Sequence, residues 1–117
     1  MKWLEIISEK LGLQRQALFE MSNLTSSDTG LPFVVFVSQK AGAKHDIRVK
    51  VGQSTKYIPG QEVTVALRPF RVIGKRTLRS SDLAALKTWV DINMTVLLDY
   101  WNGDISTRQM LDRIQKI

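Results

Sequence analysis

The chain has 117 residues, a net charge of +6 and no cysteine. A chain of this length is expected to form one domain, over residues 1–117, with a hydrophobic core of its own. Without cysteine, disulfides, thiolate metal sites and cysteine nucleophiles are excluded. Charged residues interrupt the apolar N-terminus and no apolar run approaches about 18 residues, so we expect a cytoplasmic protein without a membrane partner.

The positive charge is concentrated in the middle of the chain. Residues 40–79 hold ten Lys and Arg against two acidic residues, which gives this segment +8, and the rest of the chain −2. A surface of one sign attracts polyanions and therefore favours an anionic partner. The alternative is that the strands simply place Lys and Arg on a solvated face, where they discourage edge pairing.

The N-terminal third is predicted to change from helix to loop. Apolar residues at helical spacing predict one helix from Lys2 to about Met21, interrupted or kinked at Gly12. Residues 22–30 are rich in side chains that compete with the backbone for hydrogen bonds, so we expect a loop there.

The central part predicts an antiparallel sheet of four to five strands. Residues 32–38 form a continuous apolar run, typical of a strand buried on both faces, and a hairpin loop around Gly42 follows. Residues 45–51 alternate between apolar and charged side chains, as expected for a strand with one buried face. Further strands are predicted at 56–58, at 62–68 and, after Pro69, at 70–73.

Two helices are predicted to complete an α+β fold and to pack as a pair on one face of the sheet. The first begins at Ser80 or Ser81 as N-cap, runs to residues 101–102 and ends with Gly103 at the C′ position. The second is capped by Ser106. The apolar stripe of the second helix is Met110, Leu111, Ile114 and Ile117.

Candidate catalytic and metal-ligating residues are few. His45 is the single histidine, so histidine-pair zinc sites are excluded, and a polar residue at a strand edge is the favoured interpretation of it. Asp99, Asn102 and Asp104 offer oxygen ligands close together, but the same residues are typical of a helix end. There is no phosphate-loop motif. We therefore predict no catalytic residue, no metal and no cofactor.

Three residues of the long helix have structural interpretations. Asn93 lies near the apolar stripe and is expected to hydrogen bond to a neighbouring loop carbonyl. Trp89 and Trp101 are expected in the core, although a partly exposed tryptophan could anchor a protein interface.

The basic strands carry the predicted binding site. Tyr57 and Phe70 are interleaved among the cations, and a sheet face with cations and aromatics can hold phosphates and stack bases. The alternative is that the two aromatic rings point inward. The predicted nucleic-acid-binding residues are Lys44, Arg48, Lys50, Lys56, Arg68, Arg71, Lys75 and Arg76.

From His45 to Trp101 the layout resembles a group of small bacterial domains of unknown function. The shared features are a basic strand led by a histidine, H-D-I-R-V-K-V, and a helix ending N-M-T-V-L-L-D-Y-W. The chain departs from the group in lacking a second histidine in that strand and in its predicted N-terminal helix. The resemblance implies an α+β module of the kind carried in mobile or accessory bacterial genes, and no particular chemistry.

The sequence therefore favours a non-enzymatic binding module that uses basic strands on an anionic partner, nucleic acid first. The alternative is a protein-interaction or inhibitor module, or a homodimer, that uses the apolar residues of the helices. An enzyme ranks third, because one histidine and no cysteine leave few catalytic groups; a nuclease that relies on Arg and carboxylates stays open.

Overall fold

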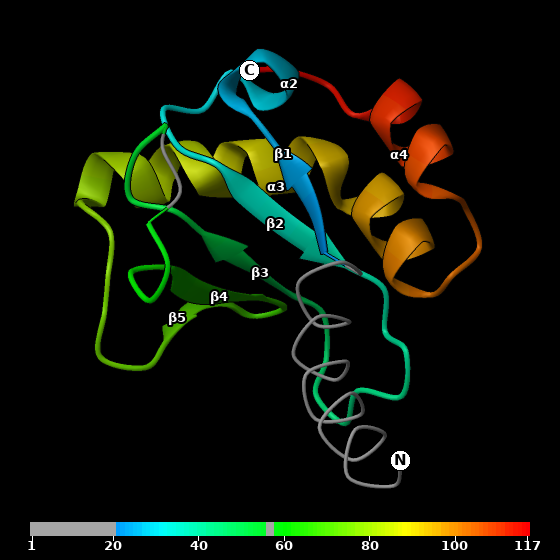
Figure 1. The fold of residues 1–117 in the computed structure, drawn as a ribbon, viewed down its shortest axis with the longest axis horizontal. Helices are drawn as coiled ribbons and strands as arrows, with labels where there is room; N and C mark the ends of the chain where they lie inside the picture. The colour runs from blue at the N-terminus through cyan, green and yellow to red at the C-terminus, as the bar shows by residue number, and fades with distance from the viewer. Residues whose placement is uncertain (1–20, 56–57) are drawn as a thin grey trace, which may run out of the picture.

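Five antiparallel strands follow one another in the sheet in the same order as along the chain (Figure 1). The computed structural model describes residues 21–55 and 58–117. The strands are β1 (Met21–Leu24), β2 (Val35–Ser38), β3 (Arg48–Val51), β4 (Val63–Leu67) and β5 (Phe70–Ile73). The helices are α2 (Ser26–Thr29), α3 (Ser80–Trp101) and α4 (Thr107–Arg113). In the described part of the chain, no helix is both long and apolar enough to cross a bilayer.

The strand register places valines together on one face of the sheet. Val49 lies opposite Val65, and Val65 lies opposite Val72 on the next strand. A second row joins Val35 to Val51 and Val51 to Val63. Because side chains alternate between faces and β-branched residues pack well on a pleated surface, these rows form one continuous apolar face.

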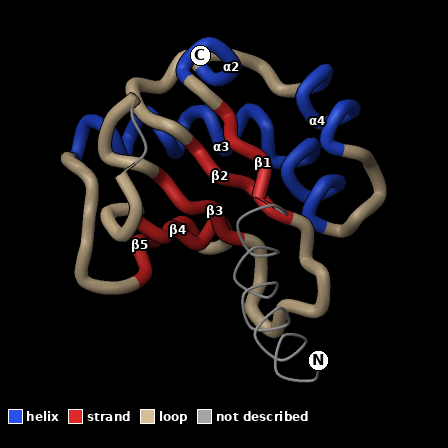
Figure 2. Tube along the Cα trace, in the orientation of Figure 1, coloured by secondary structure: helices blue, strands red, loops and turns tan. Residues whose placement is uncertain are grey.

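Helix α3 lies across this apolar face. Near the start of α3, the Nζ atom of Lys87 lies 5.8 Å from the centre of the Phe70 ring on β5. Near its end, the hydroxyl groups of Tyr100 and Ser22 on β1 are 2.9 Å apart. The helix therefore spans the sheet from one edge strand to the other, so that helices and sheet form two layers (Figure 2).

The core lies between α3 and the sheet, as expected for this fold class. Trp89 is fully buried and Trp101 is 3% exposed, which confirms both as core residues. Met110 of α4 is also fully buried and joins the same hydrophobic cluster. The predicted α+β class is therefore confirmed for the described residues.

The side chain of Asn93 on α3 forms hydrogen bonds with the C-terminal segment of the chain. Its amide Nδ2 donates to the backbone carbonyls of Trp89 and Gln115, and its Oδ1 accepts from the Gln115 backbone N–H at 2.8 Å. The backbone N–H of Ile117 then donates to the Thr29 carbonyl, close to Gly30. A Cβ atom on Gly30 would overlap the Ile117 carbonyl, and Gly30 has a φ of 80°, so glycine suits this approach. The expected bond from Asn93 to a loop carbonyl is confirmed.

Part of the predicted loop over 22–30 is wrong, because this segment contains β1 and α2. The polar residues of β1 adopt strand geometry because they pair with β2, with Ser22 opposite Val37. Helix α2 starts at a capping box, in which the Thr25 backbone N–H donates to the Asp28 carboxylate. The helix predicted from Lys2 lies outside the described residues, except for Met21, which begins β1.

The helix ends were mostly predicted correctly. Helix α3 begins at Ser80, but the N-cap position is Arg79 rather than a serine. Gly103 has a φ of 78°, and Ser106 caps α4 by accepting from the Gln109 backbone N–H, both as expected.

The predicted apolar stripe of α4 is only partly correct. Helix α4 ends at Arg113. Leu111 is 42% exposed and Ile117 is 46% exposed, so within the stripe only Met110 is fully buried. Of the short strand predicted at 56–58, residues 56 and 57 lie outside the described residues, and Ile58 is not in a strand.

Candidate nucleic-acid interface

The face of the sheet turned away from α3 collects basic side chains, and we call it the basic face. Alternation from the apolar rows assigns its members on the five strands. In one row, Arg48 lies opposite Ala66, and Ala66 lies opposite Arg71. In the next row, Phe36 pairs with Lys50 and Lys50 with Thr64. The basic face consists of Met21, Asn23, Phe36, Ser38, Arg48, Lys50, Thr64, Ala66, Arg71 and Ile73.

Three cations of the basic face have no carboxylate partner among the described residues. Arg48 and Lys50 are half-buried and Arg71 is exposed, and none of them takes part in the ion pairs that these residues form. On the helical layer, by contrast, Lys87 pairs with Asp91 and Arg113 pairs with Asp99. These three unpaired cations give the basic face a positive charge that would attract a polyanion.

Arg68 differs from the other predicted cations because it is paired. It follows β4 directly, and its Nε and Nη2 atoms donate to the two carboxylate oxygens of Asp46 at 2.7 and 2.8 Å. This hydrogen bonding, with a further bond from the Ile47 backbone, lowers the pKa of Asp46 from 3.8 to about 2. Both side chains are about half exposed, at 53% for Arg68 and 49% for Asp46, so the pair stays in contact with water.

Two hollows open along this region and share His45 and Arg48. The first has a volume of about 330 Å³ and lies between the β2–β3 loop and the basic face. Its polar lining includes Lys40, Ser38 and Lys50. The second has a volume of about 280 Å³ and lies over the start of β3 and the β4–β5 hairpin. The second hollow is lined by His45, Asp46, Ile47, Arg48, Ala66, Arg68, Pro69, Arg71 and Ile73.

His45 is exposed at the junction of the two hollows. Its ring lies 5.5 Å from the Trp101 ring at an angle of 36°, and its Nδ1 donates to the Asp46 backbone carbonyl at 2.8 Å. The carboxylate of Asp46 binds Arg68 instead of the imidazole. The described residues thus give His45 no orienting carboxylate of the kind that a catalytic triad uses.

The structure brings together part of the predicted site. Arg48, Lys50, Arg68 and Arg71 lie on or beside the basic face. Lys44 is exposed in the β2–β3 loop, while Lys75 and Arg76 are exposed in the segment between β5 and α3. Lys56 lies outside the described residues.

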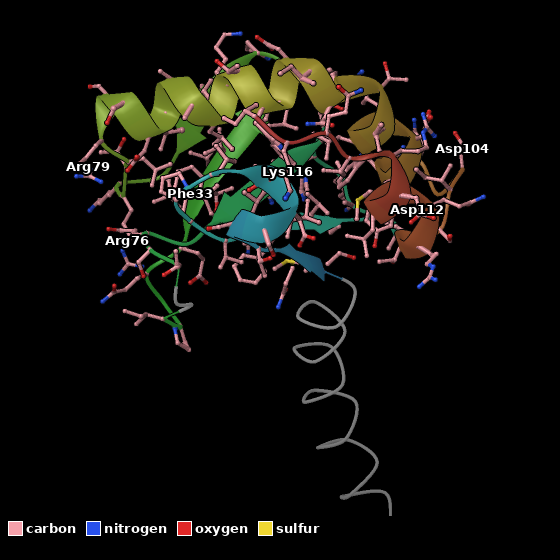
Figure 3. The ribbon with its side chains drawn as sticks, turned by 90° about the horizontal axis from the view of Figure 1, so that it is seen from above. Phe33, Arg76, Arg79, Asp104, Asp112 and Lys116 are labelled. Atoms are coloured by element: carbon pink, nitrogen blue, oxygen red, sulfur yellow. The ribbon has the colours of Figure 1, made fainter. Side chains whose placement is uncertain are left out.

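Some charged residues beyond the sheet lie at opposite ends of the molecule. Figure 3 places Arg76 and Arg79 together at one end of the molecule and Asp104 and Asp112 at the other, near α4. Lys40 lines the first hollow, although it was not among the predicted binding residues. The sequence feature that could have identified Lys40 is its place in the predicted hairpin loop around Gly42, next to the basic strand.

Of the two alternatives for Phe70, the structure shows the inward direction. Phe70 lies opposite Leu67, which is 4% exposed, and packs against the hydrophobic core beside Lys87 of α3. It therefore faces the helix. Tyr57 lies outside the described residues, and Phe36, the aromatic residue of the basic face, is only 6% exposed. A surface of this kind suits contacts with phosphates better than stacking with bases.

The oxygen-bearing residues near the end of α3 serve the fold. Asp99 pairs with Arg113 at 3.0 Å, and Asn102 occupies the C-cap position of α3. Within residues 21–55 and 58–117, no group of three or more His, Cys, Asp or Glu side chains is placed to hold a metal ion.

Comparisons with known proteins return no match for this chain, whether with family models, with curated proteins or with solved structures. The geometry of the described residues therefore carries the functional argument.

Proposed function

We propose that this protein is a non-enzymatic binding module that holds an anionic partner, nucleic acid first, on the basic face. The carrying observation is the strand register, which sets Arg48 and Arg71 on either side of Ala66, with Lys50 on the same face. None of the three is neutralised by an ion pair within the described residues. Guanidinium and ammonium groups bind phosphate oxygens, and such contacts supply most of the affinity of sequence-independent binding.

The chemistry of the face favours contacts with the nucleic-acid backbone over reading of bases. Phe70 is turned to the core and Phe36 is buried, so within the described residues no exposed aromatic ring lies on this face. Contacts with phosphates carry no sequence information directly. We therefore expect little discrimination between sequences.

The test is fluorescence anisotropy with labelled single- and double-stranded DNA and RNA at about 50 mM and about 200 mM salt. If the three cations each neutralise one phosphate of duplex DNA, the association constant should fall by about 40-fold between these salt concentrations. Salt-insensitive binding, or no binding at low salt, would contradict the proposal.

A matched pair of double variants locates the surface. Arg48→Glu with Arg71→Glu reverses two charges on the basic face and should abolish binding. Arg108→Glu with Lys116→Glu makes the same change in net charge on exposed positions of α4 and the following segment. The second pair should reduce affinity only slightly. Equal losses in the two double variants would mean that net charge, and not the basic face, determines binding.

The alternative is a protein-interaction module or homodimer that uses the helices. Its strongest candidates, Trp89 and Trp101, are buried, and the large apolar side chains still exposed on α3, α4 and the C-terminal segment are Ile92, Leu111 and Ile117. Light scattering after size-exclusion chromatography tests this alternative directly. A stable dimer that is lost in the double variant Ile92→Ser with Leu111→Ser would favour the homodimer.

The nuclease alternative is tested by incubating DNA and RNA with the protein and magnesium. Intact nucleic acid after incubation would contradict nuclease activity.

The resemblance to small bacterial domains and the cytoplasmic location stay predictions. Both are compatible with a small nucleic-acid-binding module, and neither contributes to the argument from the basic face.

A further inference from the structure

The second hollow owes its shape to a small residue between two arginines. Ala66 lies between Arg48 and Arg71 in the register, and neighbouring strands are about 4.8 Å apart, so the two arginine backbones are about 10 Å apart. The Ala66 methyl group forms a low floor, which leaves a hollow of about 280 Å³. This space has room for several water molecules and hence for a tetrahedral oxyanion with part of its hydration shell.

Three arginines are among the residues that line this hollow, Arg48, Arg68 and Arg71. The fork of a guanidinium group matches the spacing of two oxygens on a carboxylate or a phosphate. The fork of Arg68 already holds such a pair of oxygens, because Asp46 accepts from Nε and Nη2 side by side. The Asp46 carboxylate thus occupies the position on Arg68 that a phosphate oxygen pair would take.

Resting on the proposed function, we infer that this hollow is a subsite for one backbone phosphate of the nucleic acid and that Asp46 is a built-in competitor for it. The phosphate lies over Ala66 between Arg48 and Arg71. Asp46 competes with this phosphate for Arg68, so Arg68 contacts the phosphate in only part of the bound protein, and the carboxylate places a negative charge beside the phosphate. Both effects lower the affinity of the wild-type face.

The Asp46–Arg68 pair is suited to this role because it can exchange. Both side chains are about half exposed, and an exposed ion pair of this kind contributes only about 0–1 kcal/mol to stability. A phosphate can therefore displace the carboxylate without unfolding β3 or β4. Asp46 remains ionised at neutral pH, since its pKa is about 2, so the competition does not depend on physiological changes in pH.

The first variant removes the competitor. Asp46→Asn keeps the size of the side chain and removes its charge, so Arg68 becomes available to the phosphate. Binding should become tighter, and the slope of log K against log salt should steepen by up to about 0.9, the value for one full phosphate contact on duplex DNA. The advantage over wild type should then be up to about threefold larger at about 50 mM than at about 200 mM salt.

The control for this variant is Asp91→Asn on α3. Asp91 is also an exposed aspartate in an ion pair, with Lys87, and the variant makes the same change in net charge far from the basic face. It should not steepen the slope. If Asp46→Asn binds no more tightly than Asp91→Asn, the competitor role is refuted.

The second variant fills the floor of the hollow without changing charge. Ala66→Leu should weaken binding several-fold and reduce the salt slope by about one contact. Thr64→Leu is its control, because Thr64 lies on the same face of β4 but outside the lining of the second hollow. Equal affinities of the two variants would refute the subsite, and circular dichroism checks that both are folded.

A measurement on the wild-type protein does not depend on variants. In nitrogen-15 NMR spectra, the Arg68 Nε–Hε signal should shift on titration with duplex DNA, and less with an equal concentration of inorganic phosphate. An unchanged Arg68 signal in saturated protein would refute the displacement of Asp46. An equal shift with inorganic phosphate would assign the hollow to free phosphate and refute the backbone subsite.

The two proposals fail in different ways. If the wild-type protein binds no nucleic acid, the proposed function fails and the subsite fails with it. If binding is steep in salt and lost in Arg48→Glu with Arg71→Glu, but Asp46→Asn and Ala66→Leu match their controls, the proposed function stands and only the subsite is wrong.

Discussion

The two faces of the sheet are made by the same strands and differ in almost every physical property. The face under α3 carries rows of valines, with Val49, Val51 and Val65 at most 2% exposed. The basic face places Arg48 and Lys50 one residue away from these valines on β3, half-buried and without ion-pair partners in the described chain. One face supplies the stability of the fold and the other carries the charge available for binding.

The largest expected effect is on the helix-covered face. Trp89→Ala should lower the free energy of unfolding by about 3–5 kcal/mol, because Trp89 is fully buried between α3 and the sheet. Urea denaturation followed by circular dichroism measures this loss. Ile92→Ala on the same helix should change stability by less than about 0.5 kcal/mol, since Ile92 is 47% exposed. Similar losses in both variants would mean that α3 does not present Trp89 to the core.

Adjacent residues of β3 give the sharpest comparison of the two faces. Val49→Ala removes two buried methyl groups and should cost about 2 kcal/mol, counting the cavity left behind. Arg48→Ala, one residue earlier, should change the free energy of unfolding by less than about 0.5 kcal/mol, not counting the loss of packing by the methylene groups of its side chain. The same variant should weaken nucleic-acid binding. Denaturation and anisotropy on both variants measure the two effects. An exchange of the two results would mean that the register of β3 is shifted by one residue.

The attachment of the C-terminal segment to α3 should contribute less. Asn93→Ala leaves the Gln115 backbone N–H and carbonyl without their partner and should cost about 1–3 kcal/mol. Hydrogen exchange at the Gln115 amide should become faster at the same time. Thr95→Ala, at an exposed position of the same helix, is the control. Unchanged exchange at Gln115 would show that the segment is held by other contacts.

The smallest effect concerns pH and the Asp46–Arg68 pair. Because folding lowers the pKa of Asp46 from 3.8 to about 2, the ionised carboxylate stabilises the folded state above pH 3.8, and this contribution is lost as the pH falls toward 2. A carbon-13 NMR titration of the Asp46 carboxyl should give a midpoint near 2 in the wild type and a higher midpoint in Arg68→Ala. Titration near 4 in both proteins would mean that the pair does not form in solution.

Local patterns were sufficient for β2 to β5 and for α3 and α4, but not for β1 and α2. The alternation in residues 45–51 and 62–68 identified β3 and β4 and assigned one face of each to the core. The segment containing β1 was missed, because Ser22 and Asn23 have little intrinsic strand preference and are held as a strand by pairing with β2. Strand formation there depends on a neighbour that is distant in sequence.

The sequence predicted most of the cations that the candidate site contains, but not how their side chains are arranged in space. The excess of cations in residues 40–79 was visible, and alternation placed Arg48 and Lys50 on one face of their own strand. The direction of Phe70 stayed open, because it is decided by the two-residue turn at Arg68 and Pro69, which sets Phe70 opposite Leu67, and cross-strand partners share a face. Lys40 was missed because a loop has no periodicity from which its direction can be inferred.

The sequence by itself determined the α+β class, the limits of α3 to within two residues and the charge of the central strands, since all three depend on local spacing and composition. The tertiary structure decided which cations meet. The register across three strands joins Arg48, Ala66 and Arg71, and the pairing of Asp46 with Arg68 joins residues 22 positions apart. Such contacts depend on how strands align over long separations in sequence, which the pattern of any single strand does not encode.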